Sequence, residues 1–174
     1  MLRTLAVFLA FASGPAMADL QSCQKLFATV PQVLDEVNNG RSHNYEDDHP
    51  GLGYSFSFVD SKTKLTVFFY DHQQQSISPA MALESFKEAA RDMHTVAKKR
   101  GSKLSNFNAY QVGEQSQLFR LQAESESRDG KSEFLALGIV DNCIVKIRFT
   151  AHFSMDEAKR RMNVILRNMN QGFG

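Results

Sequence analysis

Two strand-forming segments separated by only two residues constrain this chain most strongly. Residues 134–140 and 143–149 are rich in branched and aromatic side chains, and Asp141-Asn142 lies between them. A connection this short joins only neighbouring antiparallel strands. Residues 118–127 precede 134–140 across Asp129-Gly130, which is a strong hairpin signal. The second half of the chain is therefore predicted to form an antiparallel sheet.

The first half adds two more strands. In residues 54–59 aromatic side chains alternate with serine, which predicts one buried face. Residues 64–70 are apolar on both faces, so this strand is expected to be central. Asp60–Thr63 supplies the turn between them. With a short strand at 107–112, the sheet is expected to hold five or six strands.

Helices are predicted at both ends of the chain and in its middle. Ser78 caps a helix over 79–100, with Pro79 at the first position, and a capping box at Ser154–Glu157 starts another over 155–169. A first helix over 19–37 is expected to break at Pro31. Each helix has one apolar stripe and must pack on a sheet face, which predicts an α+β domain with the sheet sandwiched between α-helices. The side chains predicted to be buried are Phe56, Phe58, Val67, Phe69, Leu83, Phe86, Val145, Ile147, Met162 and Ile165.

This pattern resembles that of a known fold group. Gly51-Leu52-Gly53-Tyr54-Ser55-Phe56-Ser57-Phe58, the strand at 67–70 and the capped helix resemble the opening of PsbP-like domains. The closing strand Cys143–Phe149, followed by a capped helix, is similar to their ending. The bacterial DcrB-like envelope proteins belong to the same group. The resemblance implies an antiparallel sheet between helices, in domains that mostly act as binding or assembly modules. It carries over no functional residue.

The N-terminus has the pattern of a cleavable secretory signal peptide. Arg3 precedes the apolar stretch at 5–12, and Gly14-Pro15 leads to Ala16-Met17-Ala18, an A-x-A cleavage site. The apolar stretch is shorter than the roughly 20 residues that span a bilayer. The alternatives are a core helix and lipidation at Cys23, because Leu20–Cys23 resembles a lipobox. We interpret residues 1–18 as a signal peptide and 19–174 as a single globular domain of the periplasm or a secreted protein.

Charge narrows the range of partners. Without Arg3 the chain has equal numbers of basic and acidic residues, so its net charge is near zero. Such a chain lacks the excess of basic residues that is typical of nucleic-acid-binding domains, and it is not expected to attract polyanions over long distances. No further segment is apolar enough to span a membrane. Fourteen phenylalanines without a tryptophan suit a packed core, and some could instead line a pocket for a small apolar ligand. The partner is expected to be such a ligand or another protein, and no cofactor motif is found.

The two cysteines are expected to pair. Cys23 shares the apolar stripe of the first helix, and Cys143 shares the apolar face of the last strand. An exported chain enters an oxidising compartment, where such pairs persist. The alternative is two buried free thiols, which the apolar character of cysteine allows. We favour a Cys23–Cys143 disulfide that fastens a helix to the sheet.

Residues 41–53 are polar and are predicted to form a loop. The segment from 43 to 49 holds two imidazoles and three carboxylates, a donor set that suits zinc or calcium. The candidate ligands are His43, Glu46, Asp48 and His49. They match no established spacing of metal ligands. A polar surface loop explains the same residues, and this is the interpretation that we favour.

Other reactive side chains match catalytic patterns poorly. Ser55 lies in a near match to the nucleophile elbow, but within a strand that leads to another strand rather than to a helix. Asp71 and His72 are adjacent at a strand end and therefore point to opposite faces. His94 and His152 are expected to lie at the surface or to be satisfied by local partners. The leading hypothesis is a non-enzymatic binding or accessory module, and the alternative is a small hydrolase or metal-dependent enzyme that uses the 43–49 loop.

Cleavage after Ala18 is the first testable consequence, because small residues stand where signal peptidase requires them. Protein isolated from the cell envelope should begin at Asp19, as intact-mass measurement will show. A mass that retains residues 1–18, or that includes an acyl group on Cys23, would contradict the interpretation.

Overall fold

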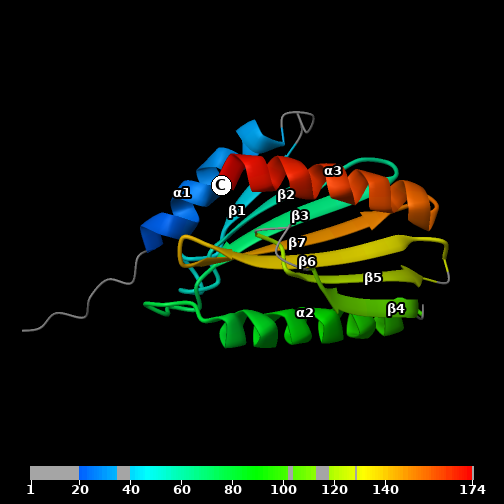
Figure 1. Ribbon diagram of the computed structural model, residues 1–174, viewed down its shortest axis with the longest axis horizontal. Coiled ribbons are helices and arrows are strands. Elements are labelled where there is room, and N and C mark those ends of the chain that lie inside the picture. Colours follow the sequence, from blue (N-terminus) through cyan, green and yellow to red (C-terminus); the bar gives the residue numbers. More distant parts are fainter. Residues whose placement is uncertain (1–19, 35–39, 102–103, 113–117, 128, 174) are drawn as a thin grey trace, which may run out of the picture.

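The computed structural model describes residues 20–34, 40–101, 104–112, 118–127 and 129–173. The predicted leader, residues 1–18, lies outside them. Seven strands form one sheet in the order β1-β2-β3-β7-β6-β5-β4, and every neighbouring pair is antiparallel (Figure 1). The strands are β1 (Arg41–Asn44), β2 (Tyr54–Val59), β3 (Thr63–Tyr70), β4 (Leu104–Gln111), β5 (Leu121–Ser127), β6 (Ser132–Val140) and β7 (Cys143–Ala151).

Three helices cover the two faces of the sheet unequally. Helices α1 (Leu20–Val33) and α3 (Met155–Phe173) pack together on one face, over the larger apolar core. Helix α2 (Pro79–Lys99) packs on the other face, mainly against β5 and β6 (Figure 1). On that side, β1 and β2 are not covered by a helix of the described chain. None of the described helices has both the length and the apolar character needed to cross a membrane.

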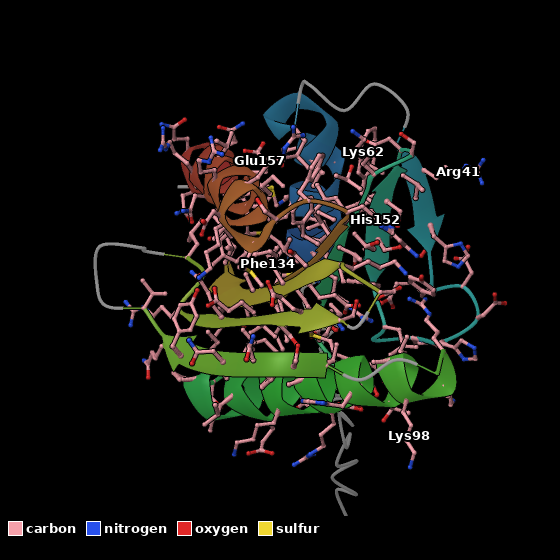
Figure 2. The ribbon with its side chains drawn as sticks, turned by 90° about the vertical axis from the view of Figure 1, so that its right-hand side faces the viewer. Arg41, Lys62, Lys98, Phe134, His152 and Glu157 are labelled. Carbon is pink, nitrogen blue, oxygen red and sulfur yellow. A yellow bond between two sulfur atoms is a disulfide. The ribbon has the colours of Figure 1, made fainter. Side chains whose placement is uncertain are left out.

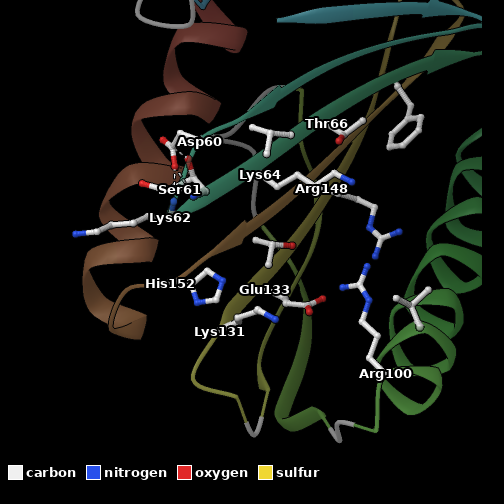
Figure 3. Close-up of a pocket in the computed structure, with 15 residues that line it drawn as sticks. Asp60, Ser61, Lys62, Lys64, Thr66, Arg100, Lys131, Glu133, Arg148 and His152 are labelled. Carbon is white, nitrogen blue, oxygen red and sulfur yellow. Dashed lines mark hydrogen bonds between the residues drawn. The ribbon is translucent and has the colours of Figure 1, made fainter. Parts of the chain in front are cut away.

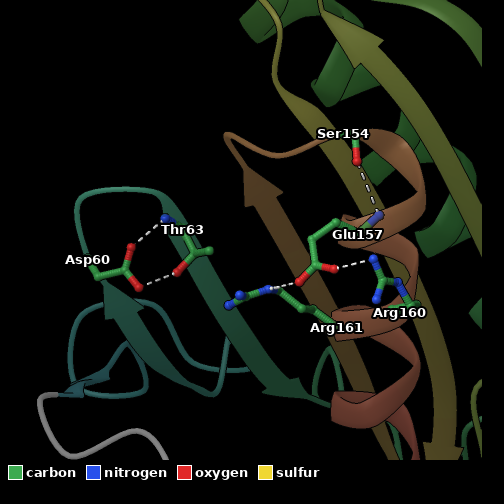
Figure 4. Close-up of polar contacts among 6 residues, drawn as sticks. All are labelled: Asp60, Thr63, Ser154, Glu157, Arg160 and Arg161. Atoms are coloured by element: carbon green, nitrogen blue, oxygen red, sulfur yellow. Dashed lines mark hydrogen bonds and ion pairs between the residues drawn. The ribbon is translucent and has the colours of Figure 1, made fainter.

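The predicted hydrogen bonds to the capping hydroxyls of Ser78 and Ser154 are present. The Ser78 hydroxyl accepts a hydrogen bond from the Met81 amide, and Pro79 occupies the first helical position of α2. The Ser154 hydroxyl accepts from the Glu157 amide at the start of α3 (Figure 4). The capping box is incomplete, because the Glu157 carboxylate pairs with Arg160 and Arg161 within α3 instead of accepting from the Ser154 amide. Both caps satisfy amides that have no partner inside the helix.

Two elements differ from the prediction. Residues 41–44 were predicted as loop and instead form β1, a seventh strand. Its four residues are all exposed, so the strand has no apolar alternation and is held by its pairing with β2. Helix α1 runs on through Pro31 to Val33 rather than breaking there. Proline removes only one backbone donor, and the Leu34 amide still donates to the Val30 carbonyl at 2.9 Å.

Burial follows the predicted faces with one error. Phe56, Val67, Phe69, Phe86, Val145, Ile147 and Met162 are buried, while Phe58 and Ile165 are half-buried. Leu83, predicted to be buried, is 40% exposed. The buried face of α2 is formed by Ala82, Phe86, Ala89, Met93 and Ala97. Leu83 follows Ala82 by one residue, which rotates it by about 100° to the edge of that face.

A disulfide joins the α1 layer to the sheet. Cys23 of α1 and Cys143 at the start of β7 are bonded, with their Cα atoms 5.3 Å apart. Both residues are buried, and the alternative of two free thiols is wrong. Because the sulfur of Cys23 is bonded to that of Cys143, it is not the attachment point of a lipid in this structure. The bond links residues 120 positions apart, which restricts the unfolded chain strongly.

Removal of this bond should destabilise the protein markedly. The chain-entropy model gives about 4 to 5 kcal/mol for a loop of this length. The Cys23→Ala/Cys143→Ala variant should therefore unfold at a much lower urea concentration than the oxidised protein, and the reduced protein should behave similarly. Alkylation of denatured, unreduced protein supplies the control. Two labelled thiols per chain, or equal stability of the oxidised protein and the variant, would contradict the account.

Candidate functional site

The four predicted metal ligands, His43, Glu46, Asp48 and His49, each have separate local contacts and do not form one cluster. His43 lies on β1, with its ring 4.2 Å from that of Tyr45. The Glu46 carboxylate turns inward and accepts hydrogen bonds from the amides of Gly51 and Gly53. Asp48 and His49 donate their amides to the Tyr45 carbonyl in the turn that follows. In the described chain, no group of three or more His, Cys, Asp or Glu side chains is arranged to hold a metal ion.

Glu46 therefore organises the β1–β2 loop. Its two carboxylate oxygens accept hydrogen bonds from the amides of Gly51 and Gly53. Backbone amides shielded from water need such acceptors, because an unpaired buried amide is costly. Gly53, with φ of +68°, allows the loop to approach β3 closely, since a Cβ there would lie 1.7 Å from the Phe69 carbonyl oxygen. The loop is thus fixed against the sheet by backbone contacts.

The other candidates are also held by local contacts. Ser55 is buried on β2, and its hydroxyl donates to the Tyr45 hydroxyl at 3.4 Å. Asp71 is buried and accepts from the Gln73 amide, whereas His72 is exposed and its Nε2 lies 3.0 Å from the Ser85 hydroxyl of α2. Asp71 and His72 thus do not act on one another. The His72–Ser85 contact, which the sequence does not predict, ties the β3–α2 loop to α2.

A groove of about 360 Å³ opens between the sheet and the last turn of α2 (Figure 3). We call it the cationic groove, and it is lined by the β2–β3 turn, β3, β6, β7 and α2. The side chains that define it are Lys62, Lys64, Thr66, Arg100, Glu133 and Arg148. Thr150 and His152 of the same strand end complete its rim. It lies on the side of the sheet that faces α2, away from the larger core.

Strand register explains why these side chains meet. Thr66 on β3 is directly opposite Arg148 on β7, and Lys64 is opposite Thr150. Glu133 on β6 is opposite Thr150 from the other side. Paired residues point to the same face of a sheet, so these side chains form one polar surface. Their neighbours along β3 and β7, Val67 and Ile147, fill the core on the opposite face.

Two guanidinium groups enter the groove from different elements. Arg148 extends from β7, and Arg100 extends from the C-cap of α2, where its amide is held by the Val96 and Ala97 carbonyls. Figure 3 shows the two guanidinium groups facing the same space, with the Glu133 carboxylate pointing toward it from β6. Neither arginine forms an ion pair with an acidic residue of the described chain.

The acidic residues near the groove do not neutralise it. The Asp60 carboxylate accepts hydrogen bonds from the Thr63 amide and hydroxyl (Figure 4). It also accepts one from the Lys62 amide. These bonds, led by that from Lys62, hold the pKa of Asp60 below its usual value. Within the described chain, Glu133 forms no ion pair with either guanidinium. The groove therefore presents positive charge to solvent.

A half-buried lysine, Lys146, lies on the same face of the sheet as Arg148. It lies next along β7, and its ammonium group sits over the rings of Phe68 and Tyr70, at 4.6 and 5.1 Å from the ring centroids. Burial, and then the charge of Arg148, lower its pKa. The aromatic faces compensate in part by cation–π attraction. The charges of Asp92 and Glu88 on α2 oppose this lowering.

The sequence predicts part of the cationic groove. The alternation of Lys146, Arg148 and Thr150 opposite an apolar face predicts a polar sheet surface. Arg100 is explained by the helix dipole alone. Nothing in the sequence indicates that β3 pairs with β7 or that α2 ends above them. The groove depends on these two long-range placements.

Known proteins resemble this chain in structure but not detectably in sequence. No family model matches the chain, and no curated protein matches its sequence. The structure is similar to the solution structure of a cyanobacterial PsbP, CyanoP from Synechocystis sp. PCC 6803, with a TM-score of 0.45 and 13% sequence identity. The match covers 75% of this chain and 81% of that chain. It is the loose, fold-level resemblance to PsbP-like domains stated from the sequence, and it extends to the fold only.

The purified protein should contain no tightly bound metal. The Glu46 carboxylate, one of the four candidate ligands, is already used by the Gly51 and Gly53 amides, which a metal ion would have to displace. Elemental analysis after gel filtration should find zinc and calcium well below one ion per chain. Stoichiometric metal that is lost in a His49→Ala variant would contradict this prediction and favour the metal-dependent enzyme.

Proposed function

We propose that this protein is an exported, non-enzymatic binding module that holds an anionic ligand in the cationic groove. The observation that carries the proposal is the convergence of Arg100 and Arg148 from two separate elements on one groove. Guanidinium groups are suited to this task because they bind carboxylate and phosphate oxygens through paired N–H donors.

The groups in the groove favour binding over proton transfer. A guanidinium group stays protonated at every physiological pH, so the two arginines can attract and orient an anion but do not exchange protons with it. Thr66 on β3 and Thr150 on β7 also line the groove, and their hydroxyls can donate hydrogen bonds to an anion that the two arginines hold. Such a combination of fixed charge and hydroxyl donors is typical of sites for oxyanions.

The disulfide supports export. Cys23 and Cys143 are bonded in the core, and bonds of this kind form and persist in oxidising compartments. Together with the signal-peptide pattern of residues 1–18, this favours the periplasm or the extracellular space as the place of action. Two residues that line the groove, Lys62 and His152, lie at one end of the molecule (Figure 2).

Pyrophosphate is a suitable probe because it offers two anionic groups to two guanidiniums. Each charge-assisted hydrogen bond contributes about 1.5–3 kcal/mol, so Arg148→Gln and Arg100→Gln should each weaken pyrophosphate binding roughly 10- to 100-fold in calorimetric titration. Arg167→Gln on α3, an exposed arginine outside the groove, is the matched control and should change little.

Glu133→Gln provides a test in the opposite direction. It removes the negative charge that faces the groove while keeping the size of the side chain, so pyrophosphate affinity should increase. A general loss of folding would not produce tighter binding. If the wild type binds no small anion, or if Arg148→Gln and Arg167→Gln have equal effects, the proposed site is wrong.

A further inference from the structure

The two ends of the molecule carry opposite charge. At one end the β1–β2 loop contacts the β3–α2 loop, where the His72 amide donates to the Gly51 carbonyl at 3.0 Å. The β6–β7 turn joins the β3–α2 loop through Asn142, which accepts from the Ile77 amide. These three segments, 45–53, 71–77 and 141–142, contain five acidic residues and no lysine or arginine. Burial, and then the charges of Glu46, Asp47 and Asp71, raise the pKa of Tyr54 beside them.

The opposite end is basic. The β2–β3 turn, the last turn of α2 and the β5–β6 turn come together there, and the His152 amide at the end of β7 donates to the Lys62 carbonyl at 2.8 Å. Figure 2 views the molecule from this end, with Lys62, Lys98 and His152 around it. We call this surface the basic end, and its cations are Lys62, Lys64, Lys98, Lys99, Arg100 and Arg148.

The cations of the basic end remain available to a partner. Lys62, Lys64, Lys98 and Lys99 are exposed, and none of them forms an ion pair with an acidic residue of the described chain. The acids nearby have other partners, since Asp129 is bound to Lys131 and Ser127, and Glu157 to Arg160 and Arg161. A net charge near zero thus conceals a separation of charge along the molecule.

The scarcity of apolar side chains around these cations indicates the kind of partner. Specific protein interfaces have an apolar core with aromatic or arginine anchors, and charged residues are depleted there. Among the exposed large apolar side chains of the described chain, Val59 alone lines the cationic groove, at 62% exposure. Many long cationic side chains around one small apolar residue suit a surface of anionic headgroups, which binds through charge at close range.

We propose that the basic end docks on an anionic phospholipid membrane, with a headgroup phosphate in the cationic groove. The placement of the phosphate rests on the proposed function, whereas the attraction of the surface also uses Lys98 and Lys99 outside the groove. The acidic end then faces away from the membrane, because like charges repel it, and this sets one orientation. Each lysine near such a surface strengthens binding about fivefold.

Vesicle sedimentation tests the proposal. Purified protein is mixed with vesicles of phosphatidylglycerol and phosphatidylcholine in roughly equal parts, or of phosphatidylcholine alone. It should sediment with the anionic vesicles only, and less so as salt is raised. The Lys98→Gln/Lys99→Gln variant should bind them roughly 25-fold more weakly, at about fivefold for each lysine.

Two controls separate this surface from the groove and from overall charge. Lys25→Gln/Arg167→Gln removes the same charge from exposed sites on α1 and α3 and should leave vesicle affinity within about twofold, since distant charges are screened. Lys98→Gln/Lys99→Gln should still bind pyrophosphate in solution. If the wild-type protein does not bind pyrophosphate at all, the proposed function is wrong, and not only the docking.

The following outcomes would overturn the docking proposal. The wild type could fail to sediment with anionic vesicles while still binding pyrophosphate. The two double variants could lose vesicle binding equally, which would show that only net charge matters. Tighter binding to soluble poly-glutamate than to the vesicles would show that an acidic polypeptide is the partner.

Discussion

The pairing of β3 with β7 is the contact on which both the core and the groove depend. These strands are far apart in the sequence and lie side by side from Thr63–Ala151 to Tyr70–Ile144. Side chains alternate between the two faces of a strand, so one register fixes both surfaces. Val67 beside Ile147 fills the core beneath α1 and α3, while Thr66 beside Arg148 lines the groove. A shift by one residue would place Arg148 in the core and Ile147 in solvent.

Local signals in the sequence predict much of this fold. The Asp141-Asn142 turn joins β6 to β7 as expected, and the caps at Ser78 and Ser154 start α2 and α3. The Cys23–Cys143 pairing also follows from apolar stripes and compartment. These features depend on residues close together in the chain or on a choice with few alternatives. The α+β class follows from them.

The rest depends on long-range geometry. Strand β1 has four exposed polar residues, so only its pairing with β2 reveals it. Leu83 fits a helical stripe as well as Ala82 does, and the actual direction of α2 over β5 and β6 decides which of them is buried. The groove is a stronger case, because Arg100 and Arg148 are brought together by the placement of α2 over the sheet. The composition, with its balanced charge, gives no indication of the charge separation that the fold produces.

The central claim is that the cationic groove, and not the polar 45–53 loop, is where an anion binds. Amide chemical shifts recorded by NMR during titration with pyrophosphate test it most directly, because they locate the contact residue by residue. The account predicts the largest changes at Thr66, Arg100, Glu133, Arg148 and Thr150, with the β1–β2 loop unaffected. Changes centred on residues 45–53, or spread evenly over the surface lysines, would contradict it.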